Sequence, residues 1–266
     1  MLKIRAAVLA AAFLLGSGSV FATELNCKGT AGTIEDFRYS WRLRGGLSWI
    51  AGLVFPTWGS GTLRTEFPTA AKQSINSHLL ITAPNGKPGG FFEYETEMDA
   101  SGQTTLMSSS GYAWGDKARE ERANFDYRAR VARIRKETPE KVENKTKPLP
   151  DGQMRDVLSA IYYLRQHAPR ITKPVTAEIY SDGKEYPVMF RPIETKTFDF
   201  DGRRVSALGF EIVDAPGGKK WPGKVKVYIS ADDRRIPFRI DIERSLASVE
   251  LTLQSVEACG FMQASK

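Results

Sequence analysis

The residue types that most often carry catalysis or bind metals are few in this chain of 266 residues. Of its two histidines, His78 stands in the strand-like stretch SINSHLLIT, and His167 falls in the last turn of a predicted helix. A partly positive imidazole suits the negative end of a helix dipole. We interpret both histidines as structural residues. Two histidines are too few for a histidine-rich metal site, so we expect neither a metal nor a cofactor.

Compact catalytic motifs are absent from the sequence. It contains no GxSxG elbow, P-loop, helix-opening GxGxxG, HExxH or EF-hand loop. Asp232 and Asp233 could form a pair of carboxylates, but adjacent residues of a strand point to opposite faces, and Arg234 and Arg235 follow at once. We interpret the two aspartates as part of a solvated turn, and we expect a protein that is not an enzyme.

The two cysteines, Cys27 and Cys259, lie near the two ends of the chain. Neither has a CxxC spacing or a neighbouring histidine, so a reactive thiol or a metal pair is the weaker alternative. A disulfide between them would close a very long loop, which the chain-entropy model values at about 5 kcal/mol. We predict this disulfide, and with it that the first and last strands lie side by side.

One apolar segment, residues 45–61 (GGLSWIAGLVFPTWGSG), has no charge between Arg44 and Arg64, and its glycines make it a poor helix. Two interpretations stay open. The segment is either a buried strand pair or plug that fills the concavity of a sheet, or a hydrophobic lip that contacts an acyl chain or a bilayer. On the second interpretation the candidate ligand-binding residues are Leu47, Trp49, Ile50, Leu53, Phe55 and Trp58.

Alternation of apolar and polar residues predicts that most of the chain forms strands. Residues 125–134 read as one long strand with arginines on its other face. Asp182-Gly183 and Asp201-Gly202 suit two-residue hairpin turns, and such short links favour antiparallel neighbours. The other predicted strands lie within residues 34–43, 92–98, 175–181, 204–213, 224–230, 238–243 and 247–256.

One helix is predicted between these strands. Residues 138–150 are charged and contain three prolines, so we interpret them as a linker. Asp151 is expected to cap a helix over residues 152–167 that ends at Ala168-Pro169. Apolar residues recur at helical spacing from Met154 to Leu164. This stripe needs an apolar surface to cover, and the concave face of the sheet is the obvious one.

The first 22 residues read as a cleaved signal peptide. Lys3 and Arg5 precede an apolar run, and small residues lead to a cleavage site after Ala22. The run from Ala6 to Leu15 is half the roughly 20 residues that span a bilayer, so no transmembrane span is expected in the mature chain. Residues 23–266 are then periplasmic, where disulfides persist.

Charge and composition narrow the class of partner and fold. Removal of Lys3 and Arg5 leaves 36 basic and 31 acidic residues, a net charge of +5. This excess permits attraction to anionic lipid headgroups and requires no nucleic acid. With 41% hydrophobic and 26% charged residues and a mean hydropathy of −0.33, the chain is not disordered, collagenous, coiled-coil or multi-span. We favour a single domain over residues 23–266.

Three stretches resemble an exported bacterial family catalogued as domain of unknown function 3108: MRDVLSAIYYLRQ (154–166), VYISADDRRIPFRIDIE (227–243) and LASVELTLQ (246–254). GGL at 45–47 and GTL at 61–63 resemble its early glycine-containing strand pair, whereas residues 48–60 depart from it. The family's strand pattern is similar to the half-open barrels of LolA/LolB-like periplasmic lipoprotein carriers, which hold acyl chains beneath a helical lid. The resemblance implies a fold and not a function.

These observations predict a mainly β protein, with a single strongly curved antiparallel sheet, a half-open barrel, wrapped around one main α-helix. The leading hypothesis is a non-enzymatic periplasmic protein that binds a lipid, a lipoprotein acyl chain or another apolar ligand in the concave face of the sheet. The alternative is a structural or assembly factor of the cell envelope. It would dock a protein partner through the sheet edges or the arginines at 128, 130, 133 and 135.

Overall fold

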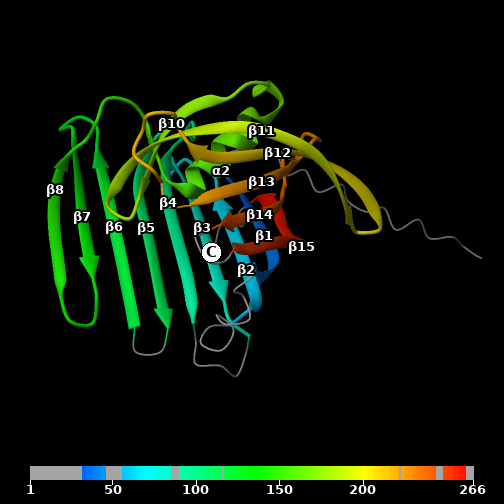
Figure 1. The fold of residues 1–266 in the computed structure, drawn as a ribbon, viewed down its shortest axis with the longest axis horizontal. Coiled ribbons are helices and arrows are strands. Elements are labelled where there is room, and N and C mark those ends of the chain that lie inside the picture. The colour runs from blue at the N-terminus through cyan, green and yellow to red at the C-terminus, as the bar shows by residue number, and fades with distance from the viewer. Residues whose placement is uncertain are drawn as a thin grey trace, which may run out of the picture.

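The computed structural model describes residues 32–45, 56–84, 90–114, 117–221, 223–243 and 248–261. Within these ranges one large sheet of fifteen strands curves around a single α-helix, α2 (Val157–His167), as predicted. A short 3-10 helix, η1 (Ala168–Arg170), follows it. In Figure 1, α2 lies between the strands β2–β8 and the strands β10–β13 that cross in front of them. The strands are β1 (Thr33–Arg44), β2 (Trp58–Glu66), β3 (Ser74–Thr82), β4 (Phe91–Asp99), β5 (Thr105–Trp114), β6 (Lys117–Asp126), β7 (Val131–Glu137), β8 (Val142–Pro148), β9 (Met154–Arg155), β10 (Val175–Ser181), β11 (Lys184–Phe200), β12 (Arg203–Asp214), β13 (Lys224–Ser230), β14 (Pro237–Glu243) and β15 (Ser248–Phe261).

The strand order explains the half-open shape. It runs β8 to β1 in reverse sequence order, then β15 to β9, so the two chain ends of the sheet meet at β1 and β15. This antiparallel pairing, with Tyr39 opposite Leu253, confirms that the first and last strands are neighbours. Every pairing is antiparallel except that of β9 with β10. The outer strands β8 and β9 do not pair, and the barrel therefore stays open.

The helix packs on the concave face of the sheet. Its buried residues Leu158, Ile161 and Leu164 join one core cluster with side chains of both arms, such as Leu79 of β3 and Phe190 of β11. Fully burying a leucine or isoleucine stabilises a fold by about 1.5–3 kcal/mol. The helix therefore holds the two arms of the sheet together. None of the helices within the described ranges combines the length and apolarity needed to cross a membrane.

The helix begins later than predicted. Met154 and Arg155 pair with β10 as a short parallel strand, and Gly152 has a φ of +111°, so no helix can run through residues 152–155. Asp156, rather than Asp151, is the N-cap. Its carboxylate accepts the Ser159 N–H at 2.8 Å, and the Ser159 Oγ accepts the Asp156 N–H at 2.8 Å, which forms a capping box.

Two other predictions about local structure are wrong. Residues 142–148, expected as part of a linker, form the edge strand β8. The long strand expected over residues 125–134 is a hairpin, because the chain turns after Asp126, whose Oδ1 accepts the Ala129 N–H at 2.8 Å. Arg130 has a φ of +57° in this turn, and β7 begins at Val131. Arg128 and Arg130 therefore lie in the turn and not on a strand face.

The predicted hairpin turns are confirmed. Asp182 and Asp201 have φ values of +53° and +51°, and the glycines that follow them have +70° and +69°. Positive φ at both central residues defines the turn that matches strand twist. Asp232 and Asp233 also lie in a turn, where the Asp232 carboxylate accepts hydrogen bonds from Ser230 and Arg234.

The disulfide and the signal peptide fall outside what the structure describes. Cys259 lies in β15 opposite Glu35 of β1, whereas Cys27 and residues 1–22 lie outside the described residues. The disulfide, the cleavage after Ala22 and the single-domain division therefore stay predictions.

Candidate ligand-binding site

Cross-strand register places a row of aromatic and charged side chains on the concave face. Phe92 of β4 is opposite Tyr112 of β5, and Tyr112 is opposite Arg119 of β6. Directly paired residues share a face, because side chains alternate along each strand. The next row on this face consists of Tyr94, Ser110, Glu121, Lys136 and Glu143. The concave face thus changes from apolar near β3 to charged near β8.

Side chains of the described residues fill much of the interior beneath the helix, and two spaces between them are narrow, at about 30 Å³ each. A space of that size holds about one water molecule and no acyl chain. The two spaces share Tyr94, Val157, Leu158 and Ser181, and we call them together the crevice. Its apolar part is also lined by Leu79, Ile161, Trp221, Gly223, Val225, Ile240 and Ile242. Its polar part is also lined by Ser108, Ser110, Glu121, Asp156, Tyr180 and Asp182.

The aromatic pair Phe92 and Tyr112 lies on the concave face without the helix to cover it. Phe92 is 49% exposed and Tyr112 is 37% exposed, and their ring centroids lie 6.2 Å apart. A single exposed apolar side chain is common, but adjacent exposed rings form a contiguous apolar patch, which is the more informative observation. Because Tyr94 follows Phe92 on the same face and lines both parts of the crevice, the pair marks one end of a continuous apolar surface.

Trp221 brings a polar atom without a partner to the apolar part of the crevice. The side chain is 5% exposed, and its Nε1–H has no acceptor among the residues that the structure describes. Its backbone N–H donates to Asp214 Oδ1 at 2.7 Å, which fixes the residue in place. A buried donor without an acceptor costs about 1–3 kcal/mol. A ligand with an acceptor oxygen would remove that cost.

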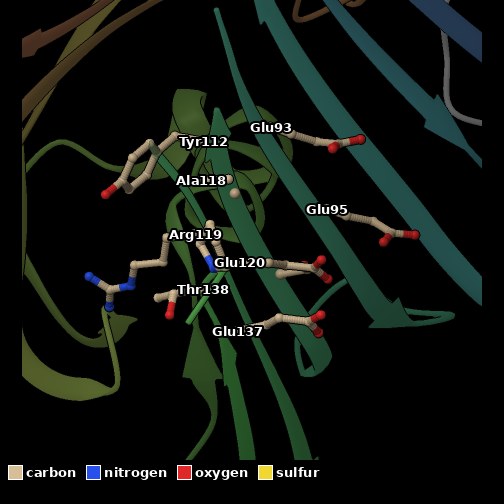
Figure 2. A pocket seen from close by; sticks show the side chains of 11 residues that line it. Glu93, Glu95, Tyr112, Ala118, Arg119, Glu120, Glu137 and Thr138 are labelled. Atoms are coloured by element: carbon tan, nitrogen blue, oxygen red, sulfur yellow. The ribbon is translucent and has the colours of Figure 1, made fainter. Parts of the chain in front are cut away.

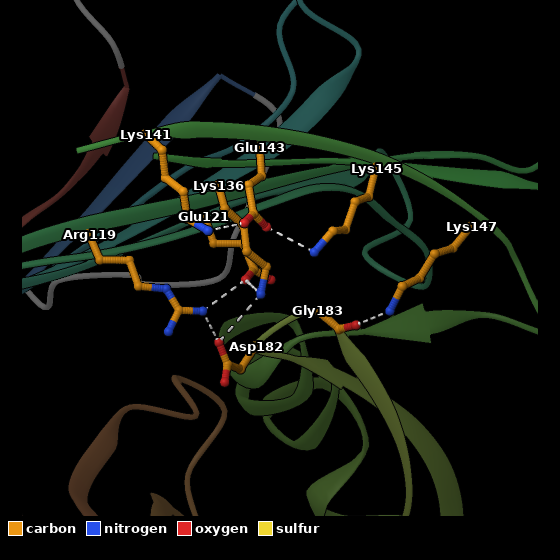
Figure 3. Close-up of polar contacts among 9 residues, drawn as sticks. All are labelled: Arg119, Glu121, Lys136, Lys141, Glu143, Lys145, Lys147, Asp182 and Gly183. Atoms are coloured by element: carbon orange, nitrogen blue, oxygen red, sulfur yellow. Dashed lines mark hydrogen bonds and ion pairs between the residues drawn. The ribbon is translucent and has the colours of Figure 1, made fainter. Parts of the chain in front are cut away.

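The turn between β10 and β11 closes the polar part of the crevice through charged contacts (Figure 3). Asp182 forms an ion pair with Arg119, and Lys147 Nζ donates to the Gly183 carbonyl at 2.6 Å. Lys136 Nζ lies 2.6 Å from Glu121 Oε2, and the Tyr180 hydroxyl donates to Glu121 Oε1 at 2.8 Å. Burial, and then the charge of Glu121, raises the pKa of Tyr180. We call these contacts the clasp.

The helix itself is anchored at both ends. At its start, Asp156 is fully buried and accepts a hydrogen bond from Thr96, and burial raises the pKa of its carboxyl group. Near its end, Arg165 donates to both oxygens of Glu35 at 2.7 and 3.0 Å and to the Arg235 carbonyl at 2.8 Å. Breaking a buried pair of this kind costs about 3–5 kcal/mol. Within the clasp, Glu121, with its partners Lys136 and Tyr180, is buried, whereas the Arg119–Asp182 pair is partly exposed and is therefore the weaker contact.

The structure describes only one of the six predicted ligand-binding residues. Trp58 begins β2 and is 61% exposed, and it alternates with the inward-facing Gly59, Gly61 and Leu63, so it lies on the convex face. Leu47, Trp49, Ile50, Leu53 and Phe55 lie outside the described residues, and their role stays a prediction. Sequence reasoning missed Phe92 and Tyr112, whose alternation in β4 and β5 reveals a strand but not their exposure.

The two histidines are structural in their contacts. His78 of β3 lies on the convex face with its Nε2 2.7 Å from Glu93 Oε1. The ring of His167 packs 4.4 Å from that of Tyr163 in the last turn of α2. Burial, Arg170 and Arg155 lower the pKa of His167, which opposes the positive imidazole expected at this helix end. No cluster of metal-ligating side chains occurs within the described ranges.

A broad groove on the convex face has a different chemistry. It has a volume of about 410 Å³, and its carboxylates come from Glu93, Glu95, Glu120 and Glu137. Figure 2 shows these four side chains on one side of the sheet, with Tyr112 and Arg119 directed to the other. The lining of this groove is thus acidic where the concave face is aromatic and basic, and the arginines Arg133 and Arg135 lie elsewhere on the convex face of β7.

Comparison with known proteins gives a family and a fold. The solved structure of a beta-barrel-like protein of domain of unknown function DUF1849 from Brucella abortus is similar in fold, with a TM-score of 0.56 at 10% identity, over 86% of this chain and 98% of that one. Mycobacterium tuberculosis lipoprotein LppX aligns over 91% of this chain and 93% of its own at 14% identity, but its TM-score of 0.28 is too low to argue from. No curated protein matches the sequence.

A family model gives the stronger result. It describes DUF3108, a protein of unknown function, and it matches residues 47–254. The match includes the helix that begins after Asp156, the turn at Asp232 and the first half of β15, which are the stretches that carried the resemblance in the sequence. Since the model matches most of the chain, the protein belongs to the DUF3108 family.

Proposed function

We propose that this protein is a non-enzymatic binder of a lipid, an acyl chain or another apolar ligand, exported to the periplasm. The ligand enters at the concave face beside Phe92 and Tyr112. The observation that carries the proposal is the exposed aromatic pair at the end of an apolar crevice. Covering the exposed parts of two such rings contributes about 1–3 kcal/mol.

Ligand uptake requires the crevice to widen, because its two spaces of about 30 Å³ are too small for an acyl chain. The clasp is the place where it can widen. Arg119 and Asp182 are partly exposed, with side-chain exposures of 33% and 58%, and a partly exposed ion pair adds little to stability. The buried anchors of α2, in contrast, keep the helix on the sheet while the turn moves.

The neutral fluorophore N-phenyl-1-naphthylamine tests the proposal directly. The double variant F92S/Y112S removes the aromatic pair, and we expect it to weaken binding of the fluorophore about tenfold, since 1.4 kcal/mol is one decade in affinity. V142S is the matched control, because Val142 is 50% exposed on the distant edge strand β8. Equal affinities in F92S/Y112S and the wild type, or no binding by the wild type, would contradict the proposal.

The six residues predicted from the apolar segment belong to the same proposal. The strands that flank the segment, β1 and β2, have their neighbouring ends at the same end of the sheet as Phe92. Ser60 is opposite Thr82, and Thr82 is opposite Phe91. We therefore expect L53S/F55S to weaken fluorophore binding as well. An unchanged affinity would limit the site to the crevice and its aromatic pair.

A second candidate function is docking of an envelope protein at the free edge of the sheet. The observation in its favour is β8, which carries the exposed Val142 and, among the strands that the structure describes, has no neighbour on its outer side. Lysines and a proline in this strand, VENKTKP, oppose pairing with an unspecified strand. Photo-cross-linking from position 142 in cells would favour docking if it captured one defined protein while position 92 captured none.

A further inference from the structure

We infer that the ligand is an anionic amphiphile, with its chain at the aromatic pair and its phosphate or carboxylate headgroup on the basic side chains of β6–β8. This inference rests on the proposed apolar site and adds the charge of the ligand. It starts from the register: Tyr112 is directly opposite Arg119 on the concave face. Neighbouring strands lie about 4.8 Å apart, so aromatic and basic groups are within reach of one amphiphile.

The basic side chains form one group, which we call the basic cluster: Arg119, Lys136, Lys141, Lys145 and Lys147 (Figure 3). Three carboxylates oppose these five cations, namely Glu121, Glu143 and Asp182. The side chains drawn there therefore carry a net charge of +2, because Lys141 and Lys145 share one carboxylate and Lys147 contacts a backbone carbonyl instead. An anionic group is the natural complement of such an excess.

Sharing of carboxylates leaves hydrogen-bond donors for a ligand. Lys141 and Lys145 both pair with Glu143, and these contacts lower the pKa of its carboxyl group to about 2. Lys147 donates to a backbone carbonyl, that of Gly183, which carries no charge. Each ammonium has three donors and each guanidinium has five. Phosphate and carboxylate oxygens accept several such donors at once.

Headgroup binding also connects to opening of the crevice. Asp182 lies in the turn that closes the polar part of the crevice, and its side chain is 58% exposed. Its carboxylate forms an ion pair with Arg119. A headgroup oxygen that replaces the Asp182 carboxylate on Arg119 releases this turn. A ligand of the correct charge therefore favours the open crevice that its chain requires.

The charges on the opposite face of the same strands favour binding of the anionic headgroup on the concave face. Glu93, Glu95, Glu120 and Glu137 line the convex face behind β4–β7 (Figure 2). These carboxylates repel an anionic headgroup there, and they would attract a cationic one. A zwitterionic headgroup brings its own cation toward the net positive cluster. The two faces together select a headgroup of negative net charge on the concave side.

The experiment compares three single-chain amphiphiles of equal chain length, each below its critical micelle concentration. They are lauroyl lysophosphatidylglycerol, which is anionic, lauroyl lysophosphatidylcholine, which is zwitterionic, and dodecyl maltoside, which is neutral. Calorimetry on the full mature chain should give the anionic lipid about tenfold higher affinity than either of the others. High salt screens charges and should therefore reduce this preference for the anionic lipid. This test uses the wild-type protein alone.

Variants identify the side chains that cause the preference for the anionic lipid. In R119Q/K145Q the affinity ratio of anionic to zwitterionic lipid should fall to about one. R133Q/R135Q is the matched control: it removes two cations from β7 that are 58% and 59% exposed on the convex face, and it should keep the wild-type ratio. Circular dichroism checks that each variant is folded. A ratio that R133Q/R135Q lowers as much as R119Q/K145Q would overturn the inference.

The two proposals fail in different ways. Equal affinity for all three amphiphiles would overturn the anionic headgroup and leave the apolar site in place. Absence of binding by any of them would overturn both. Binding of free glycerol phosphate as tightly as the lysolipid would show that the cluster recognises phosphate without a chain, and it would also contradict an amphiphilic ligand.

Discussion

At the scale of single residues, the crevice keeps two buried polar groups in costly states. Trp221 holds an N–H without an acceptor among the described residues, and Asp156 holds a carboxylate away from water. Hydrogen bonds from Thr96 and Ser159 offset part of the cost for Asp156. Sites that bind ligands often retain such strain because the ligand relieves it. Substitutions at both residues should therefore change the free energy of unfolding.

The variant W221F keeps an apolar ring at the crevice and removes the orphaned N–H donor. Without ligand, loss of the unpaired donor should add about 1 kcal/mol to the free energy of unfolding. This gain offsets part of the destabilisation that the smaller ring causes. Urea unfolding measures the change. W41F is the contrasting variant, because the Trp41 Nε1–H donates to the Thr82 carbonyl at 2.8 Å and its loss should destabilise the fold. Equal destabilisation by both variants would contradict the assignment of an unpaired donor.

Asp156 should make stability fall as pH rises. Burial raises the pKa of its carboxyl group in the folded state above the ordinary 3.8. The folded state therefore binds the proton more tightly, and this contribution is complete below pH 3.8 and is lost as pH rises through the folded pKa. D156N cannot titrate. Urea unfolding across this range should show D156N gaining stability relative to the wild type as pH rises, and a constant difference would refute the raised pKa.

At the scale of elements, the β10–β11 hairpin is the part of the molecule that we expect to move. Its turn is joined to β6–β8 by the clasp. Beneath the turn, the ring of Tyr180 packs edge-on against that of Phe125, with 5.1 Å between the ring centroids. The helix α2, by contrast, combines a buried ion pair with an apolar face. The tip of the turn is held by the partly exposed Arg119–Asp182 pair, and such a contact opens more readily than the buried contacts of Tyr180 and Glu121 below it. The crevice should therefore open at the turn.

D182N tests this motion, and D201N is its matched control. Both aspartates occupy the same position of an Asp-Gly turn, with φ values of +53° and +51°, and asparagine tolerates that conformation. D182N loses the ion pair with Arg119, so hydrogen exchange in β10–β11 and the association rate of N-phenyl-1-naphthylamine should both increase. D201N should change neither. Similar exchange in the two variants would show that the clasp does not control the turn.

At the scale of the whole molecule, closure of the chain ends decides how rigid the half-open sheet is. β1 and β15 form the centre of the sheet, and both arms extend from them. The outer strands β8 and β9 do not pair, and the two arms meet there through side-chain contacts such as Phe125 with Tyr180 and Lys147 with Gly183. A covalent link near the central pair would hold the base of both arms, while only side-chain contacts hold the outer edges together.

The Cys27–Cys259 disulfide is the expected link. Protein isolated from its native compartment should show no free thiol, and intact-mass spectrometry should show a gain of about 2 Da on reduction. The same spectrum should give a chain that begins at Thr23. Reduction should lower the free energy of unfolding by at most about 5 kcal/mol. Two free thiols in the native protein would exclude the bond.

Local patterns of the sequence were sufficient for the architecture and insufficient for the site. Alternation in segments such as 224–230 and 238–243 predicts strands, and Asp-Gly at 182 and 201 predicts their turns, because these signals depend on neighbouring residues. The helix start was misplaced, because Met154 and Arg155 pair with a strand that follows them in the chain. Residues 142–148 were missed as a strand, because their charges and proline suit an edge whose position is set by the rest of the sheet.

The sequence by itself determined a mainly β chain with one helix, its family, and the absence of compact catalytic motifs. Only the tertiary structure decided that the described side chains pack against one another beneath the helix, that Phe92 and Tyr112 are exposed, and that Arg119 is opposite Tyr112. The reason is physical. Exposure and charge complementarity depend on which strands the curvature of the sheet brings face to face, and no local pattern encodes contacts such as that between Arg119 and Asp182.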